Sequence, residues 1–378
     1  MVAPLLRFTE FTDDWEETTL ENLAEVERGK FSVRPRNDPR YFDGEMPFVQ
    51  TGDVAGSDMY LKGYSQTLNA DGIKVSKVFP ADTILITIAA NIGDTTITRY
   101  AVACPDSVVA IQSKKDKANT IFLKNLIDLQ KEVLDSQATQ NAQKNINLQV
   151  LKPLELFAPS IEEQTKIASF LSNVDEKISQ LTQKHELLSQ YKQGMMQKLF
   201  SQHIRFKADD GSEFGEWEEL KFKDVIKIKY GKDHKKLEDG DIPVLGTGGI
   251  MRYVDSYLYD GESILIGRKG TIDKPQFISG KFWTVDTLFY TEIGEKIQPK
   301  FAFQQLLLVN WLNLNEATGV PSLNTTSIGN IELKVPNLKE QTKIANFLSA
   351  IDQKIEVVAQ QIEQAKTWKK GLLQQMFV

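Results

Sequence analysis

The stretch PSIEEQTKIASFLSNVDEKISQLTQKHELLSQYKQGMMQKLF occupies residues 159–200 and occurs a second time, as PNLKEQTKIANFLSAIDQKIEVVAQQIEQAKTWKKGLLQQMF, at residues 336–377. The two copies align without a gap at an offset of 177 and share 19 identities in 42 positions. Because similarity at a fixed offset is the signature of an internal repeat, the stretch is a duplication. The rest of the chain is organised around it.

Each copy predicts one long helix. A cap residue, Ser160 or Asn337, is followed three positions later by Glu163 or Glu340, which is the spacing of a capping box in which the Glu reaches back to the cap amide. Apolar positions then recur at alternating steps of four and three. In the first copy this seam is Ile167, Leu171, Val174, Ile178, Leu181, His185, Leu188, Lys192, Met195 and Leu199. In the second it is Ile344, Leu348, Ile351, Ile355, Val358, Ile362, Ala365, Lys369, Leu372 and Met376. A seam of this length is typical of a coiled coil.

The two helices are each other's most economical partners. If residues 201–335 form a compact domain with neighbouring termini, the second helix begins close to where the first ends, so the pair runs antiparallel. We therefore expect an α+β protein with two mixed α/β domains, at residues 1–158 and 201–335, separated by two antiparallel coiled-coil helices at residues 159–200 and 336–378. The arrangement has pseudo-twofold symmetry.

The two globular domains also look duplicated. Trp15 and the Gly29-Lys30 pair match Trp217 and Gly231-Lys232 at an offset of 202. PFVQTG at residues 47–52 resembles PVLGTG at residues 243–248, whereas most of the intervening sequence diverges. The domains are expected to share one scaffold and to differ in their loops.

Short β-like runs bounded by Gly, Pro and Asp predict strands in both domains. The clearest are residues 83–89, 108–112, 263–267 and 283–290. One helix is expected late in each domain, at residues 120–135 and 300–314. The Gly-rich loops at residues 246–249 and 267–270 lack the spacing of a phosphate-binding loop and are interpreted as tight turns.

The composition is that of an ordinary soluble chain, with 378 residues, 41% hydrophobic and 25% charged. The single cysteine, Cys104, excludes a disulfide within the chain and is expected to be an inert core thiol. We find no signal peptide and no apolar run long enough for a membrane span, which predicts a cytoplasmic protein.

No residue pattern indicates catalysis. The three histidines have no metal-ligand spacing, and neither a nucleophile elbow nor a kinase signature occurs. We expect no metal, no cofactor and no enzymatic activity.

The charge distribution is local. The net charge is −6, and residues 1–158 carry 17 basic and 22 acidic residues against 17 and 20 for residues 201–335. One window, residues 28–40, nevertheless holds five basic side chains and a single acid, Asp38. Any nucleic-acid surface must therefore be a patch rather than a whole face.

The order of these motifs resembles a known family. Two domains that each open with a Trp and a Gly-Lys pair, and that each lead through a Pro and a Glu-Gln pair into a long helix, are similar to the specificity subunit of a type I restriction-modification system. The motif stands here as Pro159 with Glu163-Gln164 and as Pro336 with Glu340-Gln341. The resemblance covers essentially the whole chain.

This resemblance implies a non-catalytic subunit whose variable domains are target-recognition domains and whose helices are the spacer. Such a subunit recruits two methyltransferase (M) subunits, and through them restriction (R) subunits, to a bipartite asymmetric site on double-stranded DNA. The spacer would act as a ruler. About 40 helical residues span about 60 Å, which at about 3.4 Å per base pair limits the separation of the half-sites to under about 18 base pairs.

Candidate DNA contacts follow from side-chain chemistry, because Arg and Lys hold phosphates, Arg reads guanine, and Gln or Asn reads adenine. The candidates are Arg28, Lys30, Arg34, Arg36, Arg40, Gln140, Asn141, Lys144, Lys232, His234, Lys235, Lys236, Arg268 and Lys269. For the Gln-rich stretch, a solvated loop is an equally good interpretation. We expect replacement of Arg34 and Arg36 by Ala to weaken binding to the first half-site only.

Some residues identical in both repeats lie off the seam, and they are candidates for partner binding: Phe170, Asp175, Phe347 and Asp352. For Phe170, packing against its own recognition domain is the alternative.

Two other functions compete with this interpretation. A coiled-coil scaffold that binds only proteins would suit the acidic net charge, but it has no need for two domains with one frame and divergent loops. An enzyme acting alone, such as a nuclease or methyltransferase, lacks the expected Gly loop or metal cluster.

Overall fold

The computed structural model describes residues 3–138 and 145–378, which form two compact units. The first unit comprises Met1–Gln180 and Ile362–Val378, and the second comprises Leu181–Gln361. Each unit therefore contains one globular domain together with the beginning of one long helix and the end of the other. The candidate contacts Gln140, Asn141 and Lys144 lie outside the described residues.

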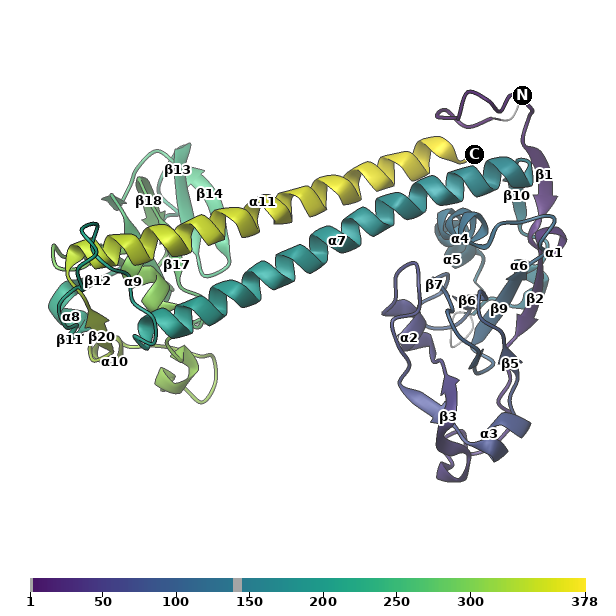
Figure 1. Ribbon diagram of the computed structural model, residues 1–378, viewed down its shortest axis with the longest axis horizontal. Helices are drawn as coiled ribbons and strands as arrows, with labels where there is room; N and C mark the ends of the chain where they lie inside the picture. Colours follow the sequence, from purple (N-terminus) through teal and green to yellow (C-terminus); the bar gives the residue numbers. More distant parts are fainter. Residues whose placement is uncertain (1–2, 139–144) are drawn as a thin grey trace. The chain divides into compact units, whose positions relative to one another are not determined.

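The first unit contains two four-stranded sheets and one two-stranded ribbon (Figure 1). The ribbon pairs β1 (Glu16–Thr19) with β10 (Glu155–Ala158). One sheet is antiparallel, with the order β2 (Ala24–Arg28), β9 (Val108–Ser113), β6 (Ile84–Thr87), β7 (Thr95–Ile97). The other has the order β4 (Gln66–Leu68), β3 (Phe42–Phe48), β8 (Val102–Ala103), β5 (Val78–Phe79), and its β3 and β8 are parallel.

Short helices connect these strands. They are α1 (Leu20–Leu23), α2 (Thr51–Ala55), α3 (Ala70–Lys74), α4 (Thr120–Leu129), α5 (Lys131–Gln137), α6 (Leu148–Leu151) and a 3-10 turn at Pro39–Tyr41. The helix predicted at residues 120–135 is thus two helices, because the backbone leaves the helical conformation at Gln130, the residue where α4 ends and α5 begins.

The second unit repeats this topology. Its ribbon pairs β11 (Glu218–Lys221) with β20 (Glu332–Val335). The antiparallel sheet runs β12 (Ile226–Tyr230), β19 (Leu288–Ile293), β16 (Ser263–Gly267), β17 (Gln276–Ile278). The mixed sheet runs β14 (Gly249–Val254), β13 (Asp239–Gly246), β18 (Lys281–Thr284), β15 (Tyr259–Asp260). The identical strand order confirms that the two domains share one scaffold.

The helices of the second unit are α8 (Phe222–Val225), α9 (Pro299–Leu306), α10 (Thr325–Gly329) and a 3-10 turn at Trp311–Leu314. The helix predicted at residues 300–314 therefore ends early. The strand predicted at residues 283–290 is also two strands, since Val285 N donates to Leu245 O and Leu288 N donates to Val285 O, which closes a turn. The Gly-rich loop at residues 246–249 is the tight turn of the β13–β14 hairpin.

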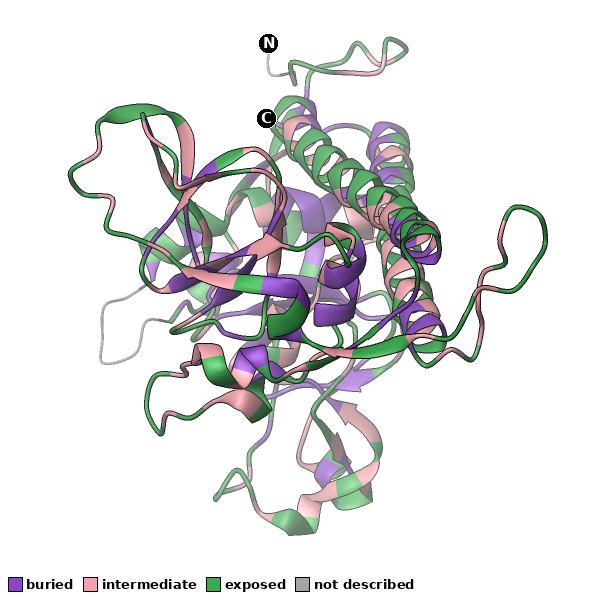
Figure 2. Ribbon diagram, turned by 90° about the vertical axis from the view of Figure 1, so that its left-hand side faces the viewer, coloured by how far each residue is buried: buried purple, intermediate pink, exposed green. Residues whose placement is uncertain are grey.

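The two long helices are α7 (Ile161–Phe200) and α11 (Leu338–Met376), and they run antiparallel within each unit (Figure 1). In the first unit, Ile167 and Leu171 of α7 share a core with Leu372 and Met376 of α11. In the second, Ile344 and Leu348 of α11 share a core with Met196 and Leu199 of α7. Buried and exposed residues lie on different sides of these helices (Figure 2). The predicted α+β architecture is confirmed.

Two equivalent ion pairs lock the antiparallel register. Lys369 Nζ lies 2.6 Å from Asp175 Oδ1 in the first unit, and Lys192 Nζ lies 2.6 Å from Asp352 Oδ1 in the second. These lysines occupy seam positions, and each pairs across the seam with the repeat-equivalent acid. The helices therefore tolerate a charge at an apolar position because a partner carboxylate is supplied.

The two long helices each contain a glycine at the same place of the repeat, Gly194 and Gly371. A close approach of two backbones would explain a glycine at this place. A Cβ atom built at either position meets nothing within 4 Å, so helix packing does not require a glycine there.

Cys104 is fully buried, and burial raises the pKa of its thiol to about 12. The prediction of a core thiol is confirmed. In the ranges 3–138 and 145–378, no helix is both long enough and apolar enough to cross a membrane.

Candidate nucleic-acid interface

The Gly-Lys pair has the same structural role in both units: it rests against a turn that follows β8 or β18. A Cβ atom on Gly29 would lie 2.3 Å from Pro105 O, and one on Gly231 would lie 1.9 Å from Val285 O. Only glycine allows this approach. The next amide is then fixed, since Lys30 N donates to Cys104 O at 3.0 Å and Lys232 N donates to Thr284 O at 2.8 Å.

We call these turns the first turn (residues 104–107) and the second turn (residues 284–287). The second turn gathers basic segments from two directions. Besides Lys232 N, it accepts hydrogen bonds at Thr287 O from the amides of Arg268 and Lys269, at 2.9 Å and 3.2 Å. Arg268 Nη1 donates to Asp286 O at 3.1 Å, and its guanidinium lies 5.5 Å from the centre of the Tyr230 ring. The second turn thus brings the candidate segment that begins at Lys232 close to the candidate pair Arg268-Lys269.

Two arginine side chains also bond to the first turn, where the carboxylate of Asp106 neutralises one of them. Arg28 Nε donates to Asp106 O, and Arg36 Nη2 lies 2.8 Å from Asp106 Oδ2. Both side chains belong to the predicted basic window, and Lys30 stands exposed beside them.

The other two arginines of the window make only local contacts. Arg34 Nη1 donates to Val33 O at 2.7 Å, and Arg40 Nη2 lies 2.6 Å from Asp38 Oδ2. The hydrogen bond from Arg40 lowers the pKa of Asp38. All four arginines of the window remain exposed, so they are available to a ligand.

A hollow of about 770 Å³ lies beside the second turn. It is bounded by residues 233–235, by the hairpin residues 246–251 and by residues 285–287. His234 is one of its lining residues, and its Nδ1 is buried without a hydrogen-bond partner among the described residues. Lys232 and Lys236 lie two residues before and two residues after His234 in the sequence.

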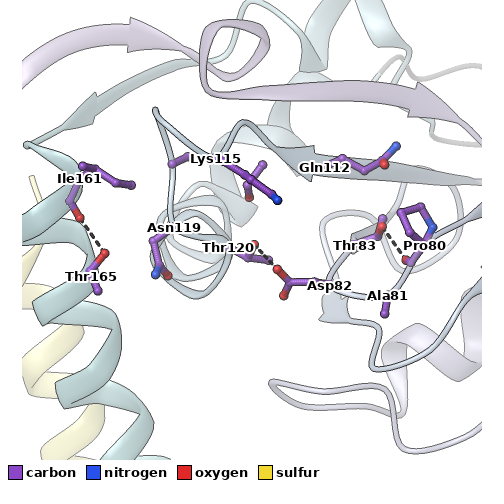
Figure 3. A pocket seen from close by; sticks show the side chains of 12 residues that line it. Pro80, Ala81, Asp82, Thr83, Gln112, Lys115, Asn119, Thr120, Ile161 and Thr165 are labelled. Atoms are coloured by element: carbon purple, nitrogen blue, oxygen red, sulfur yellow. Dashed lines mark hydrogen bonds between the residues drawn. The ribbon is translucent and has the colours of Figure 1, made fainter.

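Another hollow, of about 460 Å³, lies in the first unit between the end of β9, the start of α4 and the start of α7 (Figure 3). Its polar side chains largely satisfy one another or nearby carbonyls. Thr120 Oγ1 donates to Asp82 Oδ2 at 3.0 Å, Thr83 Oγ1 to Pro80 O at 2.8 Å, and Thr165 Oγ1 to Ile161 O at 2.7 Å. We assign no function to it.

The Glu-Gln pair at the start of each long helix is a structural clamp. Ser160 Oγ and Asn337 Oδ1 do accept from the amides of Glu163 and Glu340, as the capping box predicts. The Glu side chains, however, do not return to the cap amide. Glu163 instead accepts from Arg7 Nε at 2.8 Å, from Arg7 Nη2 at 2.7 Å and from Trp15 Nε1 at 3.4 Å.

The same clamp recurs in the second unit, where Glu340 accepts from Arg205 Nε at 3.0 Å, Arg205 Nη2 at 2.7 Å and Trp217 Nε1 at 3.2 Å. The glutamine that follows each Glu bonds to the backbone of the globular domain in the same unit. Gln164 accepts from Asn119 N at 3.0 Å, and Gln341 accepts from Gln298 N at 2.7 Å. Neither arginine was predicted as the partner of the Glu, although Arg7-Phe8 and Arg205-Phe206 are a repeated pair in the sequence.

The candidate partner-binding residues have contacts within their own units. Phe170 lies 5.8 Å from Phe8 and 6.1 Å from Trp368 between ring centres, and Phe347 lies 5.6 Å from Phe206. The contact with Phe8 supports the alternative that Phe170 packs against its own recognition domain. Asp175 and Asp352 form the ion pairs of the seam. A role of the four residues in partner binding stays a prediction.

An exposed aromatic residue occurs at an equivalent place in both repeats. Tyr191 on α7 is 51% exposed and Trp368 on α11 is 53% exposed. Each directly precedes a seam lysine, so each stands just outside the packed seam of its own unit.

Comparison with known proteins places the chain in a family. The model of the type I restriction modification DNA specificity domain matches residues 12–190 and 215–367, one copy for each half of the chain. The MjaVIII specificity subunit of Methanocaldococcus jannaschii is 26% identical, over 88% of this chain and 88% of its own length. The EcoprrI specificity subunit of Escherichia coli is 22% identical, over 82% and 81%.

The fold agrees with this assignment. A type I restriction-modification S subunit from M. genitalium, solved by crystallography, matches with a TM-score of 0.70 and covers 100% of this chain and 99% of its own, at 19% identity. At that identity the match shows the fold alone, whereas the family model covers most of the sequence. The chain therefore belongs to the family of type I restriction-modification DNA specificity domains.

Proposed function

We propose that the chain is the non-catalytic subunit that gives a type I restriction-modification complex its DNA specificity. The observation that carries this proposal is the pair of turns. Both units hold a Gly-Lys backbone against an equivalent turn, with an exposed lysine, Lys30 or Lys232, beside it. The basic side chains that bond to the first turn are Arg28 and Arg36, whereas the one that bonds to the second is Arg268. One frame with two sets of basic side chains suits the reading of two different half-sites in a bipartite asymmetric target.

The residues around the turns fit DNA by their chemistry. Exposed Arg and Lys side chains neutralise phosphates and account for most of the affinity, whereas base edges read in a groove account for specificity. The exposed arginines of residues 28–40 serve the first half-site, and Lys232, Lys235, Lys236, Arg268 and Lys269 serve the second. Methyl transfer and cleavage then belong to the M and R subunits that the chain recruits.

Replacement of Arg34 and Arg36 by Ala tests the assignment of half-sites. Each lost phosphate contact should weaken binding, so we expect roughly a tenfold loss of affinity for the first half-site and no change at the second. Footprinting or competition with duplexes altered in one half-site measures both. An equal loss at the two half-sites contradicts the assignment.

Lys115 and Lys117 provide the matched control, because they are exposed and their replacement by Ala removes the same charge. They follow β9 at its far end. Arg28 pairs with Val109 at one end of the β2–β9 ladder, whereas Ala24 pairs with Ser113 at the other. The control variant should bind the first half-site like the wild type.

The M subunits need a surface that is present twice. Tyr191 and Trp368 supply it, since half-exposed aromatic residues are over-represented in protein interfaces and these two are repeat-equivalent. We expect each substitution to weaken the binding of one M subunit by about 2 kcal/mol. Trp368→Ala should therefore release one M subunit, and the Tyr191→Ala/Trp368→Ala double variant should release both.

Native mass measurement of the co-purified complex reads the number of M subunits directly. Leu187→Ala is the control, because Leu187 is exposed on α7 but its repeat-equivalent residue is Gln364. Retention of both M subunits by the double variant would place the docking surface elsewhere.

A further inference from the structure

We propose that Asp286 reads a base of the second half-site. Its carboxylate accepts a hydrogen bond from the exocyclic amino group of a cytosine or an adenine. The inference rests on the proposed function and deepens it, because it names a specificity-determining side chain and the class of base that this side chain selects.

The backbone around Asp286 is held in place by its neighbours. Thr284 O accepts a hydrogen bond from Lys232 N, and Asp286 O accepts one from Arg268 Nη1. Thr287 O accepts two hydrogen bonds, from the backbone amides of Arg268 and Lys269. Val285 N donates in turn to Leu245 O at 3.1 Å. The second turn is thus a preorganised platform, and Asp286 is its exposed residue.

The carboxylate of Asp286 is uncommitted. Among the contacts within residues 3–138 and 145–378, it takes part in no ion pair and no side-chain hydrogen bond; only the main-chain oxygen of Asp286 is bonded. The side chain borders the hollow beside the second turn, where the hairpin residues 246–251 and His234 form other parts of the wall. It therefore has both free acceptors and room for a ligand.

The equivalent residue of the first unit is different. Asp106 stands at the same place in the first turn, at an offset of 180, but its Oδ2 lies 2.8 Å from Arg36 Nη2. An internal arginine therefore neutralises the first turn, whereas the second turn presents a bare carboxylate among basic segments. This difference lies on a frame that is otherwise shared, so it distinguishes what the two units can bind.

A carboxylate without a partner on a phosphate-binding surface weakens DNA binding unless a hydrogen-bond donor of the DNA contacts it. Phosphate oxygens, guanine O6 and N7, and thymine O4 are acceptors and would be repelled. In the major groove the donors are cytosine N4 and adenine N6, and carboxylates accept from cytosine in this way. Asp286 would thus favour an amino base and reject a keto base at one position.

The test uses the full chain co-expressed with its methyltransferase subunit, and methylome sequencing reads the recognised motif. We expect Asp286→Ala to make one amino-base position of the second half-site degenerate, with discrimination reduced roughly tenfold to a hundredfold. Asp286→Asn should admit a keto base there, because its amide adds a donor. The first half-site should keep its sequence in both variants.

Asp260→Ala is the matched control. Asp260 is exposed in the same unit and pairs with Lys281, at the opposite end of β18 from the second turn. It removes the same charge and should leave the motif unchanged. If Asp260→Ala relaxed the same position, the effect would come from net charge and the inference would be overturned.

Two further results overturn it. One is a motif that is unchanged in Asp286→Ala. The other is loss of methylation at the whole motif in both Asp286 variants, which would make the residue a support of the turn. Failure confined to these variants leaves the proposed function standing, whereas a wild-type complex that methylates no split motif contradicts the proposed function and this inference together.

Discussion

Replacement of Glu163 by Ala is expected to lower the free energy of unfolding of the first unit by about 3–5 kcal/mol. The Glu163 side chain is 2% exposed and that of Arg7 is 13% exposed, so the variant leaves a nearly buried guanidinium without its carboxylate. The indole N–H of Trp15 loses its acceptor as well. The hydrogen bond to Glu163 raises the pKa of Arg7 in the wild type, and the guanidinium stays charged in the variant because an arginine side chain is not deprotonated in proteins.

Hydrogen exchange gives the local readout. Residues 3–15 are tied to the unit by this clamp and by the bond from Leu6 N to Gln375 O at 2.8 Å, so their amides should exchange faster in the variant. Urea unfolding gives the free energy. Glu162→Ala is the control, because Glu162 is an exposed acid in the same helical turn and its loss should cost less than about 1 kcal/mol. Similar losses in the two variants would mean that the clamp does not stabilise the unit.

Replacement of Gly231 by Ala is expected to disrupt the second turn. The new Cβ would lie 1.9 Å from Val285 O and 2.6 Å from Thr284 O, and both are backbone atoms that cannot rotate away. Overpacking of this kind costs about 1–3 kcal/mol. Because the turn positions Lys232, Arg268 and Asp286, the variant should also lose affinity for the second half-site while it retains the first.

Gly194→Ala is the control for this substitution. Nothing lies within 4 Å of a Cβ at that position, and the residue is inside α7, so alanine should stabilise the protein by up to about 1 kcal/mol. Thermal unfolding and half-site competition measure the two effects separately. If Gly231→Ala bound both half-sites like the wild type, the turn would not be part of the interface.

The elements that the sequence predicted well are those with a regular local signal. The seam of the long helices follows a period that can be read directly from the chain, and Ile167, Leu348 and most other seam positions are buried as expected. The strands at residues 108–112 and 263–267 are bounded by Gly, Pro and Asp and match β9 and β16 closely.

The features that the sequence did not reveal depend on contacts between distant residues. Glu163 and Arg7 are 156 residues apart, and a local capping pattern offered a competing partner for the same carboxylate. The turn within residues 283–290 interrupts a run that is apolar or β-branched except for Asp286. The sequence did not show it, because Val285 N bonds to Leu245 O, a residue 40 positions earlier in the chain. Residue type alone located the basic side chains but could not show that Asp106 neutralises Arg36 while Asp286 stays free.

The most direct test of the central claim, that one chain directs methyltransferases to a bipartite DNA site, combines two readouts from one strain. The chain is co-expressed with its candidate methyltransferase subunit, the mass of the purified complex is measured, and the methylome of the host is sequenced. We expect two methyltransferase subunits for each chain and methylated adenines in a split, asymmetric motif. The absence of both a complex and a split motif would contradict the account and would favour a coiled-coil scaffold that binds only proteins.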